Sequence, residues 1–292
     1  MITVQPSIGT PEPLQAKDFR EVARLFRRTT QQHAHIDWRS LEEWLPDPAF
    51  HGWVVRSSGR IDAVMAATTQ LPPSRSGVAW LRFMLPGALA GQERTLDALW
   101  EALREHLIAI EIKQVALIVI NTWVTNVIAR WGFRERNAVV TMQRRSGEIP
   151  AAPEPPLVLR EVRSAGELAE IAWLDARAFG PLWQYDRDTL AAARREAATF
   201  TRLERDGQLL GYELSTRHVG SAHLARLAVL PGEQGQGLGG LLVGHMLRFF
   251  EARGIHLITV NTQEDNIRSQ RLYKRLGFEF TGHRAPVWEA EL

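Results

Sequence analysis

Residues 231–247 read PGEQGQGLGGLLVGHML, and this stretch decides how the second half of the chain is expected to fold. Gly235, Gly237, Gly239 and Gly240 stand at the start of an amphipathic helical pattern, although a glycine inside a helix costs about 1 kcal/mol relative to alanine. The first N–H groups of a helix have no partner within it and lie at the positive end of its dipole. Because glycine has no Cβ, the backbone there can approach a bulky anion closely. The stretch therefore predicts a phosphate-binding helix start.

A second polar pattern follows in the helix predicted over residues 266–276. Asn266, Ser269 and Tyr273 are spaced at i, i+3 and i+7, so their side chains are expected to project from one face of that helix. Beside the phosphate site, this face would line a long polar ligand and bring a phenol to its reactive end. A half-buried tyrosine that makes one hydrogen bond is the structural alternative.

The two halves of the chain resemble each other. Each carries, in the same order, an LPG tripeptide, a helical pattern, an apolar run, an Asn-Thr pair and a Gly-Phe pair. The clearest landmarks are Leu85–Gly87, Asn121–Thr122 and Trp131–Phe133 in the first half, and Leu230–Gly232, Asn261–Thr262 and Leu276–Phe278 in the second. A cluster of prolines between Pro150 and Pro156 breaks both helix and strand. We therefore expect two diverged copies of one fold, residues 1–145 and 157–292, joined by a linker over residues 146–156.

Ordinary local signals place the elements of the second copy. Ser164 and Glu167 have the spacing of a capping box before an apolar helix. Asp206–Gly207 is a two-residue hairpin turn between two strands. A third strand runs into the glycine loop, and the expected order is βααβββαβα followed by a hairpin around residues 278–281 and 286–289. The strands on either side of the glycine-led helix should be parallel and the others mostly antiparallel.

Residues 224–282 resemble the core of the GCN5-related N-acetyltransferase (GNAT) family. Gln234–Gly239 matches the family's Q/R-x-x-G-x-G/A pyrophosphate signature, and the NxxSxxxY helix and the LGF tripeptide follow it. The resemblance implies an α/β (α+β) protein with two tandem GNAT-like domains, each a mixed, mostly antiparallel twisted sheet flanked by helices. In the second domain, two strands would splay apart into a V-shaped cleft. The tandem arrangement is similar to that of the mycothiol synthases.

The resemblance also assigns cofactor-binding roles by position. Acetyl-CoA would be the cosubstrate, with its pyrophosphate on backbone amides of the glycine loop and its pantetheine beside the preceding strand. The downstream polar helix would contact it from the opposite wall. The residues expected to bind acetyl-CoA are Ala228, Val229, Gln234, Gly235, Gln236, Gly237, Leu238, Gly239, Gly240, Asn266 and Ser269.

The catalytic roles implied by the resemblance are less complete. Tyr273 stands where the family places its general acid, which gives a proton to the departing CoA thiolate. The backbone N–H of Val229 would steady the oxyanion. Many members carry a glutamate base near the end of the strand, but this sequence has Ser221 and His223 there. His223 and Glu213, on the preceding strand, are the two candidates for the base, and either can instead be structural.

The first half departs further from the family pattern. Residues 88–95 read ALAGQERT where the second half has its glycine loop, so side chains would fill the space of a pyrophosphate. Residues 125–133 read TNVIARWGF and contain no tyrosine. We therefore expect the first half to be a non-catalytic copy.

Composition limits the remaining choices. The chain has 292 residues, of which 45% are hydrophobic, contains no cysteine and carries a formal charge of +2. Disulfides, thiolate nucleophiles and cysteine metal sites are thereby excluded, and no metal is expected. No secretion signal or membrane span is recognisable, which predicts a cytoplasmic protein. The arginine-rich face of residues 20–28 is expected to be solvated and does not favour nucleic acid as a partner.

The sequence thus predicts an acetyl-CoA-dependent N-acetyltransferase, monomeric or homodimeric, in which a primary amine attacks the thioester directly in a ternary complex. The amine would belong to a small molecule or a protein N-terminus. By the resemblance, residues 179–186, FGPLWQYD, would shape its pocket. A non-catalytic acyl-CoA-binding sensor or scaffold is the alternative.

Overall fold

A computed structural model describes residues 9–35, 37–69, 77–87, 91–145, 147–149, 151 and 156–292. The chain forms two compact units, one of residues 1–136 with 286–292 and one of residues 137–285. Most of the predicted linker, namely residues 146, 150 and 152–155, lies outside the described residues, as do residues 88–90 of the first copy's loop.

The first unit is a sheet flanked by helices. Its strands lie in the order β1-β3-β4-β5-β6-β13, and β2 also pairs with β5. The pair β5 and β6 is parallel, whereas the other registered pairs are antiparallel. The elements are β1 (Glu12–Pro13), η1 (Ala16–Asp18), α1 (Phe19–Arg28), β2 (His33–Ala34), α2 (Leu41–Trp44), β3 (Phe50–Ser57), β4 (Arg60–Thr69), β5 (Val78–Leu85), α3 (Gln92–Ala109), β6 (Gln114–Ile118), α4 (Trp123–Arg130) and the end of β13 (Glu279–Glu291).

The second unit repeats this plan. Its strands lie in the order β7-β12-β11-β10-β9-β8, with β11 and β12 parallel and the other registered pairs antiparallel. The predicted class, α/β (α+β) with mixed, mostly antiparallel sheets in tandem, is confirmed. The elements are β7 (Arg134–Arg144), β8 (Leu157–Glu161), η2 (Ala165–Glu167), α5 (Leu168–Ala178), η3 (Pro181–Trp183), α6 (Arg187–Glu196), β9 (Ala197–Arg205), β10 (Gln208–His218), β11 (Ser221–Val229), η4 (Pro231–Glu233), α7 (Leu238–Glu251), β12 (Leu257–Gln263) and α8 (Ile267–Arg275).

Each unit includes one strand that the sequence order assigns to the other copy. Val287–Glu291 of β13 pairs with Gln114–Ile118 of β6 in the first unit. Val139–Arg144 of β7 pairs with Ile258–Gln263 of β12 in the second. The compact units therefore do not follow the predicted boundaries, and the end of the stretch 157–292 belongs to the first unit.

Local signals in the second unit mostly form as predicted. Ser164 and Glu167 make a reciprocal capping box before α5. Asp206 and Gly207 join β9 to β10 with φ values of 51° and 78°, the left-handed conformation that a tight hairpin turn needs. The predicted terminal hairpin is wrong, because Glu279–Glu291 is one continuous strand that extends to β6.

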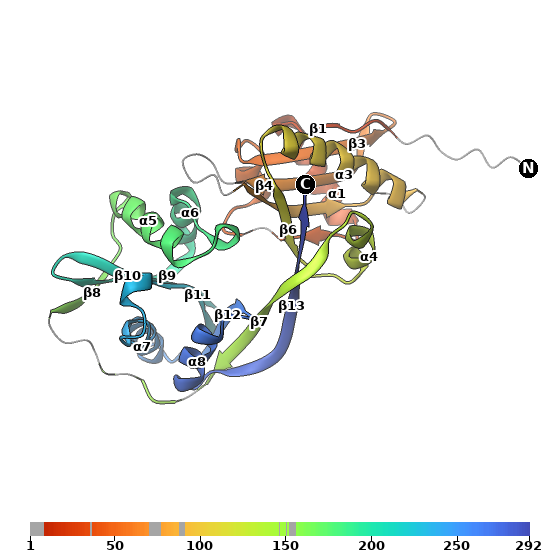
Figure 1. Cartoon of the computed structure of the whole chain (residues 1–292). Helices are drawn as coiled ribbons and strands as arrows, with labels where there is room; N and C mark the ends of the chain where they lie inside the picture. Colours follow the sequence, from red (N-terminus) through yellow and green to blue (C-terminus); the bar gives the residue numbers. More distant parts are fainter. Residues whose placement is uncertain are drawn as a thin grey trace, which may run out of the picture. The chain divides into compact units, whose positions relative to one another are not determined.

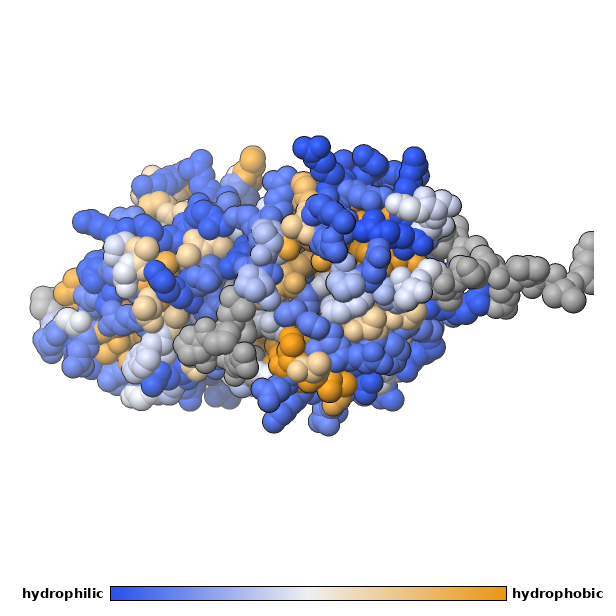
Figure 2. All heavy atoms as spheres, turned by 90° about the horizontal axis from the view of Figure 1, so that it is seen from above, coloured by the Kyte–Doolittle hydropathy of each residue, from blue (hydrophilic) through white to orange (hydrophobic). Residues whose placement is uncertain are grey.

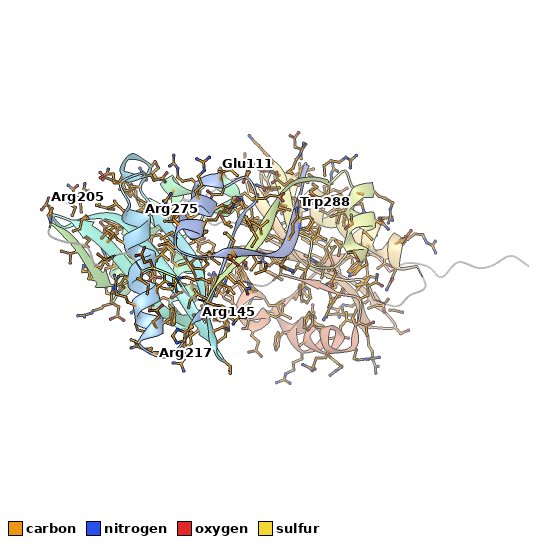
Figure 3. The ribbon with its side chains drawn as sticks, turned by 90° about the horizontal axis from the view of Figure 1, so that it is seen from below. Glu111, Arg145, Arg205, Arg217, Arg275 and Trp288 are labelled. Atoms are coloured by element: carbon orange, nitrogen blue, oxygen red, sulfur yellow. The ribbon has the colours of Figure 1, made fainter. Side chains whose placement is uncertain are left out.

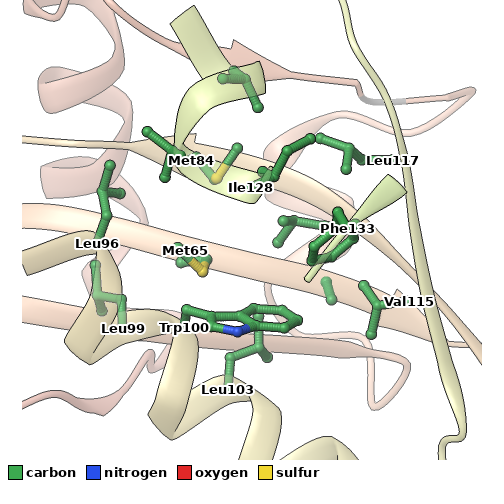
Figure 4. Packing of buried hydrophobic residues seen from close by; sticks show 14 of the residues in the cluster. Met65, Met84, Leu96, Leu99, Trp100, Leu103, Val115, Leu117, Ile128 and Phe133 are labelled. Carbon is green, nitrogen blue, oxygen red and sulfur yellow. The ribbon is translucent and has the colours of Figure 1, made fainter. Parts of the chain in front are cut away.

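The core of the first unit lies between its sheet and α3 (Figure 4). Trp100 of α3 is buried and stacks on Trp131 with ring centroids 5.2 Å apart, and Phe133 packs against it at 5.3 Å. Met65 of β4 belongs to the same cluster. Each large apolar side chain buried in this way contributes about 1.5–3 kcal/mol to folding.

Helices cover both faces of the second sheet (Figure 1). The apolar stripe of α7 packs on one face, where Val243, Met246 and Phe250 form a core with Leu224 of β11. α5 and α6 lie over the other face, and α5 contacts both β10 and β11. The sheet is therefore buried on both sides, as expected for strands that carry few exposed apolar residues.

The parallel strands of the second unit diverge. β11 pairs with β12 only over Ser221–Leu224, opposite Leu257–Val260, although β11 continues to Val229 and β12 to Gln263. A bulge at the end of the paired stretch leaves Ala225 without a partner on β10. A bulge bends its strand and increases the twist, which accounts for the divergence. The predicted splay of the two strands is therefore present.

The face of the molecule that Figure 2 shows is mostly hydrophilic, with apolar residues scattered over it. Exposed apolar side chains include Val158, Trp173 and Ile267, which lie on different elements. Within the described residues, no helix is long and apolar enough to cross a membrane.

Candidate active site

The loop between β11 and α7 has the geometry that its glycines predict. Gly235 and Gly237 have φ values of +88° and +84°, and a Cβ added to either would meet nothing within 4 Å. Both therefore combine a left-handed backbone with open space beside it. Gly239 has another purpose, because a Cβ there would approach Leu272 of α8 to 3.1 Å. Its glycine allows α7 and α8 to pack closely, whereas Gly240 has only an ordinary contact at 3.9 Å.

The backbone amides of this loop are available to an anion. Within the part of the chain that the structure describes, the N–H groups of Gly235–Gly239 donate to no protein acceptor. Those of Gly240 and Leu241 already bond to the Gly237 carbonyl, at 2.8 and 3.2 Å. The first turn of α7 has no acidic residue, so no negative charge opposes the helix dipole there. The arrangement suits a phosphate group.

Two arginines flank the loop. Arg205, at the outer end of β9 (Figure 3), pairs with Glu233 at 3.0 Å and donates to Gln236 Oε1 at 3.3 Å. Arg268 of α8 donates to Gln234 Oε1 from the other side. The loop is thus held by side chains that also bring positive charge to it.

The diverging end of β11 offers an open edge beside the loop. Leu230 N–H donates to the Leu210 carbonyl of β10 at 2.9 Å. Because successive residues of a strand direct their backbone groups to alternate edges, those of Val229 face away from β10. The Val229 carbonyl accepts a hydrogen bond there from Gln234 Nε2 at 2.9 Å. Val229 therefore presents main-chain groups where a bound chain can reach them.

Ala228 is placed differently from the prediction. It pairs with Tyr212, and the same alternation directs its backbone groups into the ladder with β10. The edge that faces the divergence consists of Leu227 and Val229. We therefore expect Leu227, rather than Ala228, to join Val229 in any main-chain contact with a ligand.

Asn266 and Ser269 are engaged with each other at the start of α8. Asn266 is the N-cap, and its Oδ1 accepts from Ser269 N–H at 3.1 Å. Its Nδ2 makes a long contact of 3.5 Å to Gln263 Oε1. The row of three polar side chains that the spacing predicts is therefore only partly formed, because Asn266 precedes the helix and uses its oxygen to cap it.

Tyr273 is buried and its hydroxyl is unpaired. The residue is 4% exposed, and its ring packs at 5.7 Å from that of Phe278. Among the described residues its hydroxyl makes no hydrogen bond to another protein group. Burial raises the pKa of Tyr273 well above its usual value, and the charge of Arg226 opposes this rise. The phenol is therefore protonated at neutral pH.

His223 lies on β11 just before the bulge. Its Nδ1 shares a hydrogen bond of 2.8 Å with the hydroxyl of Thr259 on β12. Burial lowers its pKa to about 4, with a further contribution from His218. The ring is half-buried and neutral at pH 7. A neutral imidazole can accept a proton.

Glu213 is fully buried on β10. It pairs with Leu227 across the ladder and faces α7, with Thr199 donating to one of its oxygens at 3.1 Å. Its Oε1 has no hydrogen-bond partner among the described residues. Burial raises the pKa of Glu213 to about 7, and hydrogen bonds from Thr199 and Thr201 oppose that rise. The carboxyl group is therefore close to half-protonated at neutral pH and has no direct path to solvent.

Residues 166–278 match the model of the Acetyltransferase (GNAT) family. This stretch contains the glycine loop, the diverging strands and α8. Residues 166–278 form a GNAT domain. A mycothiol acetyltransferase of Frankia alni is 32% identical over 185 residues, covering 54% of each chain. One from Streptomyces avermitilis is 37% identical over 120 residues, covering 37% of this chain and 39% of that one.

A shorter relative matches the GNAT domain alone. The ribosomal protein bS18-alanine N-acetyltransferase of Escherichia coli is 28% identical over 94 residues, covering 32% of this chain and 64% of that one. The chain spans about half the length of the longer curated relatives that it matches, and less of some.

Solved structures share the fold along the whole chain. A tandem GNAT protein from the clavulanic acid biosynthesis pathway aligns with a TM-score of 0.63 at 21% identity, covering 96% of this chain and 98% of that one. A GCN5-related N-acetyltransferase from Kribbella flavida gives 0.70 at 13% identity, covering 100% and 73%. Both units therefore have the fold of tandem GNAT proteins.

Sequence reasoning missed a buried pair in the GNAT domain. Asp175 of α5 is fully buried and receives two hydrogen bonds from Arg226 of β11, at 2.7 and 2.8 Å. The Tyr212 hydroxyl and the Tyr185 amide also donate to Asp175. The available signal was an arginine inside the apolar strand LARLAV, because a charged residue there needs a partner.

One hollow lies apart from the glycine loop. It has a volume of about 320 Å³ and lies by the other end of the β9–β10 pair, where Figure 3 shows Arg217 far from Arg205. Its lining consists of Glu196, Ala197, Ala198, Arg217, Phe249 and Arg253. Among the described residues, no group of three or more histidine, aspartate or glutamate side chains is placed to hold a metal ion.

The equivalent edge of the first unit is closed by the chain itself. β5 pairs with β6 only over Val78–Trp80, so these strands also diverge. Beyond that point β2 pairs with the free edge of β5, His33 opposite Met84 and Ala34 opposite Phe83. His35 N–H adds a hydrogen bond of 2.8 Å to the Arg82 carbonyl. The first unit thus fills with its own strand the edge that the GNAT domain leaves open.

Proposed function

We propose that the chain is an N-acetyltransferase whose second unit transfers the acetyl group of acetyl-CoA to a primary amine. The observation that carries the proposal is one juxtaposition: the open edge at Val229 lies directly before the unpaired amides of Gly235–Gly239. Both belong to a stretch that matches the GNAT family. An extended polar chain that ends in a diphosphate fits such an edge followed by such a loop.

Acetyl-CoA, the expected cosubstrate, would be held mainly by main-chain groups. The amides of the loop would bind its diphosphate, with Arg205 and Arg268 adding positive charge nearby. The edge at Leu227 and Val229 would pair with its pantetheine amides. Because Gln234 Nε2 occupies the Val229 carbonyl, that side chain would turn away when pantetheine binds.

Tyr273 would act as the general acid. Its hydroxyl is protonated at neutral pH and has no competing protein partner among the described residues. It can therefore donate its proton to the sulfur of CoA as the thioester carbon–sulfur bond breaks. The Val229 N–H, on the same open edge, would stabilise the negative charge that develops on the carbonyl oxygen.

The attacking amine must also lose a proton, and His223 is the better placed of the two predicted bases. It is half-buried and neutral, and it precedes the bulge at the start of the divergence. Glu213 faces α7 and is fully buried, so a proton would need an additional relay to reach it. We infer that His223 accepts the proton through water and, because a pKa of about 4 makes it a weak base at neutral pH, passes that proton on to solvent.

The acceptor remains within two classes, a small amine or a protein N-terminus. Both classes occur among the names of the relatives, which are a mycothiol acetyltransferase and a ribosomal protein bS18-alanine N-acetyltransferase. An acyl-CoA sensor without turnover is the second candidate, because Glu213, the carboxylate predicted as a base, is fully buried.

Release of CoA tests the proposal. The chain contains no cysteine, so a thiol-reactive dye detects only the CoA that the reaction releases. We expect release from acetyl-CoA with at least one of glucosamine, ethanolamine and a peptide that begins with alanine. Binding of acetyl-CoA by calorimetry without release from any amine would favour the sensor. Failure to bind acetyl-CoA would contradict both functions.

A further inference from the structure

The buried pair of Asp175 and Arg226 does more than join two elements. Arg226 Nη2 also donates to the Trp183 carbonyl at 2.6 Å. Its guanidinium carbon lies 3.6 Å from the ring centroid of Phe179 and 3.9 Å from that of Tyr185. The guanidinium is therefore sandwiched between two aromatic rings of the α5–α6 connection, a geometry favourable to a planar cation.

Asp175 holds the same connection by its other contacts. Its Oδ1 accepts the backbone N–H of Tyr185 at 2.6 Å, and its Oδ2 accepts the hydroxyl of Tyr212. Together the two charged residues bind the segment Phe179–Tyr185 to α5, β10 and β11. Removing either charge would leave the other buried without its partner, which is strongly unfavourable.

The pair lies on the face of the diverging strand that α5 covers. Arg226 follows the bulge directly, and its cross-strand neighbour is Leu214, while Ala228 pairs with Tyr212 on the same face. Leu227 and Val229 turn instead to the face of α7, where they pack with Leu238 and Leu242. The glycine loop and the segment Phe179–Tyr185 thus adjoin opposite faces of one strand.

Arg226 also lies at the start of the open edge. It stands between the unpaired Ala225 and Leu227, just past the last pair of β11 with β12, which is Leu224 opposite Val260. The segment that Arg226 holds therefore adjoins the point where the strands diverge, and the charge of Arg226 also acts to lower the pKa of Tyr273, against the larger effect of burial. In the first unit, Phe83 follows the bulge at Arg82, so this pair is absent from the corresponding position.

We propose that Asp175 and Arg226 form a positioning pair that fixes the segment Phe179–Tyr185 as one wall of the amine site and thereby sets the affinity for the acceptor and not for acetyl-CoA. The inference rests on the proposed function, since it names the part of that site that receives the amine. Neither residue touches the reacting atoms. Both act through the segment that they hold.

Arg226→Lys tests the pair, because lysine keeps the charge but cannot make the bidentate contact or stack between the rings. Arg202→Lys is the matched control. Arg202 is also buried, with a side chain 3% exposed against 8% for Arg226, and it pairs with Glu170 at 2.8 Å without contacting the segment. If Arg226→Lys does not fold, Asp175→Asn, which keeps the shape of the side chain, replaces it.

Three quantities are measured for each variant. For Arg226→Lys we expect the KM for the fastest amine of the panel (glucosamine, ethanolamine or the alanine-initiated peptide) to rise at least tenfold. The Kd for acetyl-CoA should change less than about twofold. Hydrogen exchange of the backbone amides over residues 179–186 should become at least tenfold faster. Arg202→Lys should leave all three near the wild-type values.

The outcomes separate this inference from the proposed function. If the wild type releases no CoA with any amine, the proposed function fails, but hydrogen exchange still reports whether the pair holds the segment. An unchanged exchange rate in Arg226→Lys overturns the positioning role. A loss of acetyl-CoA affinity as large as the rise in acceptor KM overturns its assignment to the acceptor side.

Discussion

The two units are built on the same strand pattern and differ at the positions that chemistry would need. In both, a parallel strand pair diverges and the next helix begins at a left-handed glycine, Gly91 with φ +83° or Gly237 with φ +84°. Two residues later the first unit has Glu93 and the second has Gly239. A carboxylate at a helix start stabilises the helix and repels a phosphate.

The same comparison holds at two further positions. Ile128 of the first unit and Tyr273 of the second occupy equivalent positions, four residues before the glycine of the Gly-Phe pair. Both side chains are buried in the core of their unit. The second residue after the bulge in β5 pairs with Met65 of β4, and the second residue after the bulge in β11 pairs with Glu213 of β10. At these positions the first unit has apolar side chains where the second has polar ones, and both units have the same fold. The fold therefore does not depend on the polar groups of the candidate site.

Matched glycine substitutions test this comparison with the largest expected effect. Gly237→Glu places a carboxylate among the loop amides and should weaken acetyl-CoA binding by at least about 100-fold. Gly91→Glu introduces the same side chain at the same left-handed helix start in the first unit, with similar strain, and should leave acetyl-CoA binding unchanged. Calorimetry of both variants measures the contrast. Equal losses in the two would show that the first unit also binds the cosubstrate.

Tyr273→Phe removes the proton donor and keeps the ring. A general acid typically contributes 10²–10⁴-fold to a rate, so kcat should fall by about 100-fold or more. Because the ring packs against Phe278 in either case, the Kd for acetyl-CoA should change little. Steady-state kinetics beside direct binding separates the two effects. An unchanged kcat would remove Tyr273 from the mechanism.

The buried carboxyl of Glu213 predicts a pH-dependent stability. Its folded pKa is about 7, above the ordinary value of 4.5, so its neutral form stabilises the native state below pH 4.5 and that contribution is lost as pH rises through 7. Glu213→Gln stays neutral and should be more stable than the wild type at pH 8, by about 2–3 kcal/mol, with little difference at pH 4. Urea unfolding at the two pH values measures this. A kcat that falls with Glu213→Gln but not with His223→Ala would reassign the base to Glu213.

His35→Pro probes the closed edge with the smallest expected effect on function. Proline at this position cannot donate the hydrogen bond that His35 N–H makes to the Arg82 carbonyl of β5, so the pairing of β2 with β5 should weaken and the first unit should lose about 1–3 kcal/mol, whereas His35→Ala keeps that N–H and is the control. We expect the Kd and stoichiometry for acetyl-CoA to stay within twofold of the wild type, since Glu93 and the missing loop glycines still prevent binding. A second binding event in this variant would mean that β2 alone keeps the first unit empty.

Much of this architecture could be predicted because it depends on short-range signals. The glycine spacing, the capping box at Ser164 and the turn at Asp206–Gly207 each have a local physical cause, and the duplicated landmarks gave the tandem fold. The exchange of β7 and β13 could not be predicted, since the partners of both strands are distant in the sequence and are set by the tertiary fold. The same applies to β2, a two-residue strand with no alternating pattern of its own.

The candidate site was predicted in outline and differs in detail. The cofactor contacts of Val229 and the loop stay predictions, and strand alternation directs the backbone groups of Leu227, rather than those of Ala228, to the open edge. Asn266 caps its helix because a polar residue before a helix finds an unpaired N–H within reach. The partner of Arg226 could not be found from spacing, because Asp175 is distant in the sequence and meets it only through the tertiary fold.

The stoichiometry of acetyl-CoA binding tests the central claim most directly. Isothermal titration of the wild type should give one site per chain. Hydrogen exchange with acetyl-CoA bound should show new protection over residues 225–240 and 261–273, and none over residues 78–95. Two equivalent sites per chain, or protection of β5 and the start of α3, would contradict the claim that only the second unit has an open cosubstrate site.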